Sequence, residues 1–455
     1  MVRRCYPPSK GRYDHTVSAF YIEEGRHPLK GSVSISGAKN ATLPLMAACI
    51  LSDESLNLLN VPDLADIATM CALLEHLGIS IHHDKERRHM TLKAETITSS
   101  IAPYGLVRKM RASILVLAPL LARYGTARVA LPGGCAIGSR PIDFHLQALQ
   151  RFGVSIDVFD GDVIAQNRHG KRLRGARIVF PSISVGATEN ALMAACLAKG
   201  ESILVNCARE PEVVDLARCL SSMGAQIDGI GRDVMHVQGV ETLRGTRHHV
   251  IPDRIEAGSY ALAVTACGGD IILEGCIGDH LTLLWDLLSQ HGVVISQTRA
   301  HHTGPMAGQD NVRVRMASHR PCSFDVTTDA YPGFPTDLQA QLMAVACALG
   351  GTSTIKEHIF ENRFMHVAEL RRMNADIRIR GHAATVMGTS PLRGAHVKAT
   401  DLRASMGLVI AGLAAQGATC IDDSDHIERG YEHIEKKFQS LGARIKKLDD
   451  KKNVL

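Results

Sequence analysis

The sequence predicts an α/β protein of two domains, each built from three copies of one repeated unit. Three observations lead to this prediction. A phrase of helix end, glycine and strand occurs six times, a short strand precedes each phrase, and an alanine-rich apolar helix precedes each strand. The phrases recur roughly every 70 to 80 residues, as a repeated supersecondary unit does. Two domains fit the length, because 455 residues exceed a typical single core.

The phrase that defines the repeat ends an amphipathic helix and starts an alternating strand. Glycine, or once asparagine, stands between them, because the residue after a helix end often takes a left-handed conformation. These six residues are Gly78, Gly153, Gly224, Gly292, Asn374 and Gly442.

The strand before each phrase and the helix before each strand complete the unit. The strands are expected over 56–61, 127–131, 202–206, 270–273, 352–355 and 419–421. The apolar helices are expected over 45–51, 114–121, 191–198, 261–267, 342–349 and 408–414. Helices that are apolar on nearly all sides are typical of a protein interior. The predicted unit is therefore buried helix, strand, amphipathic helix, strand.

Composition argues against several other classes of protein. The net charge of +5 is mild, and no lysine or arginine block with interleaved aromatic residues indicates nucleic-acid binding. No run of 18 apolar residues predicts a membrane span. The amino terminus lacks the apolar stretch of a signal peptide, so we expect a flexible leader over 1–24 and a cytoplasmic protein.

The twelve cysteines and twenty-two histidines show no ligand spacing. There is no Cys-x-x-Cys pair, and six of the cysteines fall in apolar helical runs. We therefore expect buried thiols in a reducing compartment, with neither disulfides nor a metal site. No organic-cofactor motif is present either, and no protein partner is evident.

A polar cluster precedes each buried helix, and some of these clusters hold cations. Helix starts carry partial positive charge and attract anions. Capping explains the serine, threonine, aspartate and asparagine residues. It does not explain Lys39, Arg111 or Arg403, because a cation at a helix start opposes the dipole. We therefore expect these residues to bind an anionic ligand. The alternative for each arginine is an ordinary salt bridge at the surface.

A glycine-rich loop, residues 131–141, places Cys135 five residues before Arg140. Glycine lets the backbone approach a ligand closely, and a thiol near cations becomes a usable proton donor or nucleophile. The alternative is a surface turn that contains a cysteine by chance.

Eight motifs together resemble the enolpyruvyl transferases, over essentially the whole of residues 25–445. They are Gly37–Asn40, Gly133–Cys135, Ser184–Thr188, Pro252–Glu256, Phe334–Asp337, Phe360–Phe364, Thr400–Arg403 and Arg429–Tyr431. The resemblance implies an inside-out α/β barrel fold of two three-repeat domains. The expected domains are 39–251 and 25–38 plus 252–455, so that a strand from 25–38 joins the carboxyl-terminal domain.

The resemblance also implies a reaction. The enolpyruvyl group of phosphoenolpyruvate is expected to move to the 3′-hydroxyl of UDP-N-acetylglucosamine with release of phosphate, as the first committed step of peptidoglycan synthesis. Asp337 matches the residue assigned to the sugar hydroxyl, and Cys135 matches the proton donor. Cys135 also implies sensitivity to the epoxide antibiotic fosfomycin.

The resemblance assigns the remaining site residues to the two substrates. Phosphoenolpyruvate is expected to bind Lys39, Arg140, Arg403 and Arg429. The expected sugar-nucleotide contacts are Asn40, Arg111, Arg140, Pro141, Ile142, Asp143, Phe144, Ser182, Ile183, Ser184, Val185, Asp337, Ile359 and Asp401.

Two departures from the family pattern and two rival functions remain open at this point. Ser182 stands where many relatives have lysine, and Glu428 replaces an aspartate before Arg429. One rival is the sister enzyme that acts on shikimate 3-phosphate, although the Cys135 loop and the 360–363 phrase belong to the nucleotide-sugar branch. The other rival is a non-catalytic paralogue that senses UDP-sugars.

Overall fold

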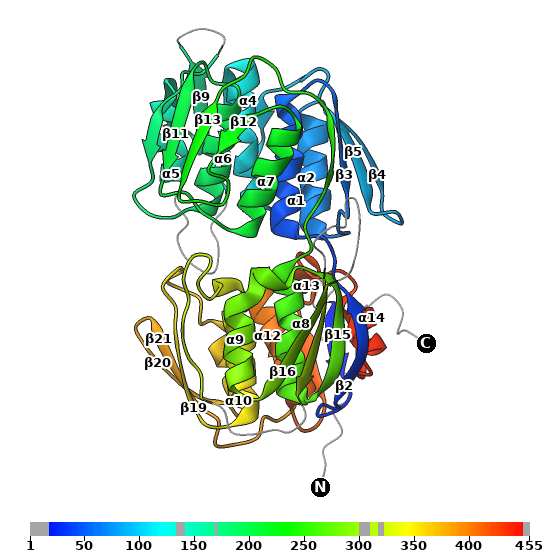
Figure 1. Cartoon of the computed structure of the whole chain (residues 1–455). Helices are drawn as coiled ribbons and strands as arrows, with labels where there is room; N and C mark the ends of the chain where they lie inside the picture. Colours follow the sequence, from blue (N-terminus) through cyan, green and yellow to red (C-terminus); the bar gives the residue numbers. More distant parts are fainter. Residues whose placement is uncertain (1–17, 133–141, 169–171, 300–309, 317–322, 449–455) are drawn as a thin grey trace.

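The chain forms two halves with separate hydrophobic cores, stacked one above the other in Figure 1. The structure is a computed structural model and describes residues 18–132, 142–168, 172–299, 310–316 and 323–448. The core of the first half lies between Ala38 and Val250. The core of the second half combines residues between Phe20 and Ile35 with residues between Ile255 and Ile445.

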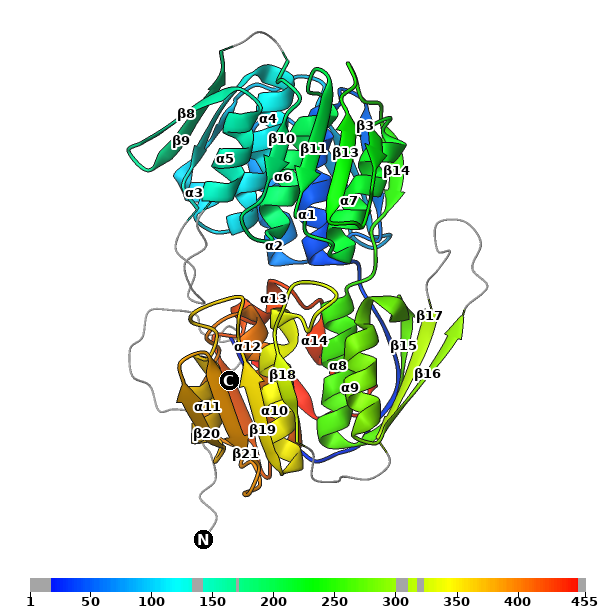
Figure 2. The same ribbon diagram turned by 60° about the vertical axis from the view of Figure 1, so that its left-hand side comes forward.

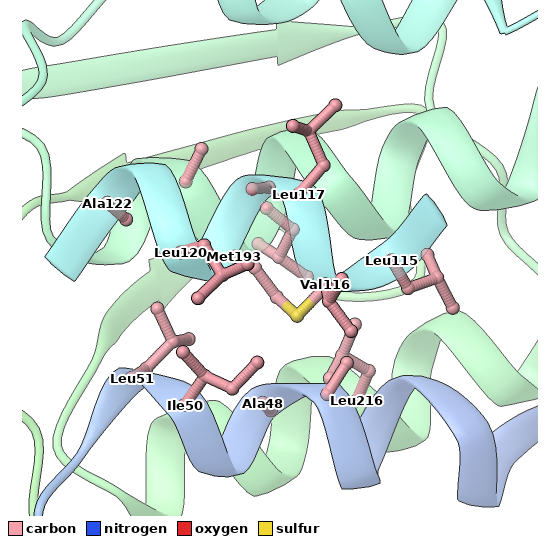
Figure 3. Packing of buried hydrophobic residues seen from close by; sticks show 14 of the residues in the cluster. Ala48, Ile50, Leu51, Leu115, Val116, Leu117, Leu120, Ala122, Met193 and Leu216 are labelled. Atoms are coloured by element: carbon pink, nitrogen blue, oxygen red, sulfur yellow. The ribbon is translucent and has the colours of Figure 1, made fainter. Parts of the chain in front are cut away.

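Each half is built around three buried helical segments, as the sequence predicts. Those of the first half are α1 (Lys39–Ala48) with η1 (Cys49–Leu51), η2 (Arg111–Val116) with α4 (Leu117–Tyr124), and α6 (Val185–Cys196). Those of the second half are α8 (Arg254–Cys267), α10 (Gln339–Leu349) and α12 (Leu402–Ala414). Figure 3 shows Leu51, Leu120 and Met193, one from each unit of the first half, packed in one apolar cluster.

Four-stranded sheets flank these helices in both halves (Figures 1 and 2). The first half holds β3 (Ser55–Leu59), β4 (Ser80–Asp84), β5 (His89–Lys93), β6 (Ile101–Ala102), β7 (Thr126–Ala130), β8 (Val154–Phe159), β9 (Asp162–Asn167), β10 (Arg177–Val179), β11 (Glu201–Val205), β12 (Gln226–Asp228), β13 (Val234–Gln238) and β14 (Thr246–His249). Their sheet orders are β14-β3-β5-β4, β6-β7-β9-β8 and β10-β11-β13-β12.

The second half repeats this arrangement. It holds β1 (Ala19–Ile22), β2 (Leu29–Ser34), β15 (Gly269–Cys276), β16 (Val293–Arg299), β17 (Asp310–Met316), β18 (Asp325–Thr327), β19 (Thr352–Lys356), β20 (Asp376–Arg380), β21 (Ala383–Met387), β22 (His396–Lys398), β23 (Thr419–Asp422) and β24 (Ile445–Leu448). The orders are β16-β17-β15-β2, β18-β19-β21-β20 and β22-β23-β1-β24. In all six sheets the strand that follows the buried helix is central, with a parallel neighbour on one side and an antiparallel neighbour on the other. The predicted six-fold repeat is confirmed.

One amphipathic helix per unit packs beside each sheet. These helices are α2 (Ala65–His76), α5 (Asp143–Arg151), α7 (Pro211–Ser222), α9 (Thr282–Gln290), α11 (His366–Arg372) and α14 (Ile434–Ser440). Shorter segments are α3 (Tyr104–Val107), α13 (Asp425–Glu428), η3 (Gly278–Leu281) and η5 (Thr336–Leu338). The six residues expected to leave these helices in a left-handed conformation do so, with φ from 72° at Asn374 to 106° at Gly224.

The expected leader over 1–24 is wrong for residues 19–22, which form strand β1. This strand lies between β23 and β24 and is antiparallel to both. Phe20 and Ile22 point into the core of the second half, where both are fully buried. The strand has only four residues, so its alternation is too short to distinguish from an irregular segment. The next strand, β2, pairs in parallel with β15 in the second half.

The chain passes between the halves twice, and the two passages lie side by side. The backbone N–H of Ala38 donates to Ile251 O at 2.7 Å, and that of Asp253 donates to Ser36 O at 2.8 Å. A Cβ on Gly37 would lie 1.8 Å from the carbonyl oxygen of Asn60, so only glycine fits this crossing. The paired passages fix where α1 and α8 begin.

Candidate active site

Lys39 and Arg429 meet at one buried carboxylate, Asp66, where the two halves touch. Lys39 begins α1, directly after the first passage, and Asp66 lies in the first turn of α2. The Lys39 Nζ lies 3.3 Å from Oδ2 of Asp66. The Arg429 Nε, from the second half, lies 2.9 Å from Oδ1 of the same carboxylate.

The charge of Lys39 depends on this arrangement. Burial lowers the pKa of the Lys39 ammonium, and the nearby Arg403 and Arg429 lower it further, whereas Asp66 and Asp337 raise it. The net pKa lies below the ordinary value. Cationic side chains that cluster in a partly buried site bind anions strongly, because the charges interact with little screening by water.

Asp337 is held between two arginines of the second half. It lies in η5, just before α10, while Arg403 lies in the first turn of α12. Its Oδ1 lies 2.9 Å from Nη2 of Arg363, and its Oδ2 lies 3.0 Å from Nη2 of Arg403. Both guanidinium groups are buried, whereas a quarter of the Asp337 side chain is exposed (25%). A carboxylate with this geometry can accept a proton from a ligand on its open side.

The ring of Tyr431 packs against the guanidinium of Arg403. The Arg403 guanidinium carbon lies 5.4 Å from the centre of the Tyr431 ring. The hydroxyl of Tyr431 lies 3.0 Å from the Ser259 hydroxyl and accepts a bond of 3.1 Å from Gln341. Burial lowers the pKa of Arg403, but Asp337 and Tyr431 outweigh it, so the net pKa is above the ordinary value and the charge is permanent.

His145 of α5 lies beside α6 and η2, two segments that hold expected sugar-nucleotide residues at their starts. Burial, and to a smaller extent the charge of Arg111, lower the pKa of His145 to about 4, so the imidazole is neutral at pH 7. Asn190 of α6 lies 2.6 Å from His145 Nδ1 and donates to Ile114 O at 3.3 Å. A Cβ on Gly186 would lie 3.0 Å from the His145 ring, so this glycine lets α5 and α6 pack closely. The starts of η2, α5 and α6 are thereby brought together.

The other predicted residues occupy the following positions. Asn40 is in α1, Ile142 precedes α5, Asp143 and Phe144 begin it, and Ser182 and Ile183 are exposed before α6. Ser184 caps α6 by accepting from Ala187 N at 3.4 Å, and Val185 follows it. Asp401 caps α12 by accepting from the backbone N–H of Arg403 and Ala404, while Ile359 is partly exposed after β19. Cys135, Arg140 and Pro141 lie outside the described residues.

Sequence reasoning missed the acids that join the halves. Arg254 of α8 makes a two-point ion pair with Glu212 of α7, at 3.0 and 3.3 Å. Glu432 accepts from Arg88 at 2.7 Å and from the backbone of Asp63 at 2.8 Å. Asp66 and Glu212 each lie in the first turn of a helix, and this position is the only local sign of their role. The sign is ambiguous, because an acid at a helix start is also favoured by the helix dipole alone.

A buried carboxyl, Glu189 of α6, lies near the Arg254 pair. Burial raises its pKa well above the ordinary value, and Glu212 and Glu210 raise it further. Burial also raises the pKa of Glu210, whose Oε1 accepts from the backbone of Tyr331 across the junction at 3.2 Å. Burial therefore makes Glu189 and Glu210 easier to protonate than ordinary glutamates.

Within the part of the chain that the structure describes, no helix is both long and apolar enough to cross a membrane.

Comparison with known proteins gives one consistent family. Residues 23–438 match the family model of EPSP synthase (3-phosphoshikimate 1-carboxyvinyltransferase). The chain is 52% identical over 432 residues to a UDP-N-acetylglucosamine 1-carboxyvinyltransferase of Rhodospirillum centenum, covering 93% of this chain and 98% of the relative. It is 50% identical to the protein of that name from Zymomonas mobilis, with the same coverage of 93% and 98%.

Solved structures show the same fold. The enolpyruvyl transferase NikO from Streptomyces tendae matches with a TM-score of 0.83 and 25% identity, covering 96% of this chain and all of that one (100%). EPSP synthase from Acinetobacter baumannii matches with a TM-score of 0.72 and 18% identity, covering 95% and 100% of the two chains.

Proposed function

The chain belongs to the enolpyruvyl transferase family, and on this premise we propose what it does and which residues do it. It transfers the enolpyruvyl group of phosphoenolpyruvate to the 3′-hydroxyl of UDP-N-acetylglucosamine and releases phosphate. The observation that carries this proposal is the identity of 50–52% over about nine-tenths of the chain with relatives named for that reaction. The carboxylate and cations gathered at the junction of the halves support it.

Phosphoenolpyruvate carries a phosphate and a carboxylate, so it needs several fixed cations. Lys39 and Arg429 supply two that already share one site, on either side of Asp66. Arg403 adds a permanent, buried guanidinium, and Arg140 is assigned to the same ligand by family resemblance. Guanidinium groups match both anions because their N–H donors form a planar fork.

Addition is the first chemical step. Asp337 takes the proton of the 3′-hydroxyl, and the resulting oxygen forms a bond to C2 of phosphoenolpyruvate while Cys135 gives a proton to C3. The product is a tetrahedral ketal phosphate. Arg363 and Arg403 each contact one oxygen of Asp337, which holds the carboxylate in position for the substrate.

Elimination completes the reaction. The methyl carbon returns a proton to the Cys135 thiolate, the C2–O bond to phosphate breaks, and the departing phosphate takes the proton held by Asp337. The enol ether of the sugar nucleotide and inorganic phosphate are released. Closure of the two halves would keep water from the intermediate. We assign the sugar nucleotide to Asn40, Arg111, Arg140–Phe144, Ser182–Val185, Asp337, Ile359 and Asp401.

The reaction is the first committed step of peptidoglycan synthesis, on which cell shape and division depend. We propose a cytoplasmic location, supported by the nine cysteines among the described residues, none of which is in a disulfide. No metal or organic cofactor is needed for this addition and elimination.

Phosphate release from phosphoenolpyruvate and UDP-N-acetylglucosamine tests the proposal, with and without fosfomycin, beside Cys135→Ala. We expect turnover that fosfomycin abolishes and a mass increase of one fosfomycin at Cys135. The variant should neither turn over at the native rate nor gain mass.

The same assay distinguishes the rivals. Release only with shikimate 3-phosphate would identify the sister activity. A folded chain that binds UDP-N-acetylglucosamine by calorimetry but releases phosphate with neither acceptor would be the sensor.

A further inference from the structure

Three side chains on two neighbouring strands of the second half converge on the solvent side of their sheet. His396 begins β22, and Cys420 and Asp422 lie in β23. The strands are parallel, and His396 lies directly opposite Cys420. Side chains two residues apart in a strand share a face, so Asp422 lies on the same side as Cys420. Between them Val397 and Ile421 point inward and are buried.

The atoms of these side chains that can bind a metal are close together. The His396, Cys420 and Asp422 ligand atoms all lie within 4.8 Å of one another. His396 Nε2 lies 2.7 Å from Oδ2 of Asp422, and the Cys420 thiol lies 3.8 Å from its Oδ1. The carboxylate of Asp422 therefore contacts both the imidazole of His396 and the thiol of Cys420.

The backbone that carries the three residues is held in place. The carbonyl of His396 accepts from Arg372 Nη2 at 2.8 Å, and the N–H of Cys420 donates to Ala395 O at 3.0 Å. The carbonyl of Asp422 accepts from Ala399 N at 2.9 Å. These bonds, with the buried residues between them, fix the Cα positions, so only side-chain rotations remain to be made on binding.

We propose that His396, Cys420 and Asp422 form a site for a divalent metal ion of the zinc class. Imidazole, thiolate and carboxylate are the ligand types that Zn²⁺ binds, and three protein ligands with one water complete a tetrahedron. Bond lengths near 2.0–2.3 Å place ligand atoms roughly 3–4 Å apart, close to the present spacing. Binding forms a metal–sulfur bond and releases the thiol proton to solvent.

The proposed metal site is separate from the proposed active site, and its expected role is in stability rather than in catalysis. Its residues lie on the outer face of a sheet, and over half of the His396 side chain is exposed (54%), which leaves room for the water ligand. Among the strands that the structure describes, β22 is at the edge of its sheet and pairs with β23 alone. The ion would tie this edge to its neighbour and stabilise the second half.

Cobalt titration of the full-length chain tests the proposal, because thiolate ligation to Co²⁺ gives a near-ultraviolet charge-transfer band. The chain carries Cys135→Ser, so that the thiol assigned to catalysis cannot contribute. We expect one equivalent of Co²⁺ to produce the band and one equivalent of Zn²⁺ to remove it. Zn²⁺ should also raise the unfolding midpoint.

Variants show whether these three residues are responsible. In the same background, Cys420→Ser should abolish the band, while His396→Ala and Asp422→Asn should weaken Co²⁺ binding at least about tenfold. Asp423→Asn and Cys71→Ser are matched controls, because Asp423 pairs with Lys398 at 2.9 Å and Cys71 is the other partly exposed described cysteine. Both controls should keep the band.

Two results would overturn the proposal. One is the absence of a band at stoichiometric Co²⁺. The other is a band that survives Cys420→Ser or has the same affinity in His396→Ala. Neither result bears on phosphate release, so the proposed function stands or fails separately.

Discussion

Asp66 and Arg429 lie in opposite halves of the structure and are joined by an ion pair of 2.9 Å. The other oxygen of the same carboxylate faces Lys39 at 3.3 Å. Asp66 therefore holds two proposed phosphoenolpyruvate ligands in position without being expected to touch the substrate itself. It is a positioning residue, and its removal should affect those cations rather than the fold.

Replacing Asp66 by asparagine should change the pH dependence of phosphoenolpyruvate use. Burial lowers the pKa of Lys39 and Asp66 opposes that, so loss of the carboxylate moves the pKa lower still. The basic limb of kcat/KM for phosphoenolpyruvate should therefore shift to lower pH, which a pH profile of kcat/KM measures. Asp63→Asn, which changes an acid paired with exposed Lys85, should leave the limb in place. An unshifted limb in Asp66→Asn would show that Lys39 titrates independently.

Asp337→Asn tests the base. The amide keeps the size of the carboxyl but cannot accept the hydroxyl proton, so kcat should fall by about 10²–10⁴. KM for UDP-N-acetylglucosamine should change far less. Asp329→Asn, an exposed acid of the same segment, is the control. If kcat falls by less than about tenfold, a group other than Asp337 is the base.

Glu212→Gln tests the ion pair between the halves. Arg254 and Glu212 are both buried, and removal of one partner leaves an uncompensated charge, at a cost of about 3–5 kcal/mol. Trp285, the single tryptophan, reports unfolding of the second half by fluorescence, and far-ultraviolet circular dichroism reports the whole chain. Asp270→Asn breaks a pair of similar geometry with Arg313 at an exposed site and should not move either transition. Equal effects of the two substitutions would contradict this account.

Glu189→Gln should stabilise the protein, and the gain should depend on pH. The folded pKa of Glu189 is raised above the unfolded value, so the native chain binds more protons between the two values and loses stability as pH rises through that window. Glutamine resembles the protonated acid and does not titrate. The urea midpoint of the variant should exceed that of the native chain at neutral pH, and the difference should shrink toward pH 4.5. A constant difference across this range would exclude the titration of Glu189 as its cause.

The repeat could be predicted from sequence because its signals are local. A left-handed residue after a helix, an alternating strand and an apolar helix are each visible within about a dozen residues, and six copies reinforce one another. Asp66 could not be found this way, because its partners come from α1 and from residue 429. His396 and Cys420 likewise meet only because β22 and β23 pair in parallel. The four-residue β1 carries too short a pattern to recognise.

The placement of β1 determines when the second half can complete its sheet during synthesis. This strand pairs with β23 and β24, so residues 19–22 are synthesised long before the strands with which they pair. The first half, whose core lies within one continuous stretch, can fold while the ribosome is still working on the second. During that interval Phe20 and Ile22 have no core to enter. A ribosome-stalled chain ending before residue 419 should therefore protect the first half from protease while its amino-terminal strand is cut.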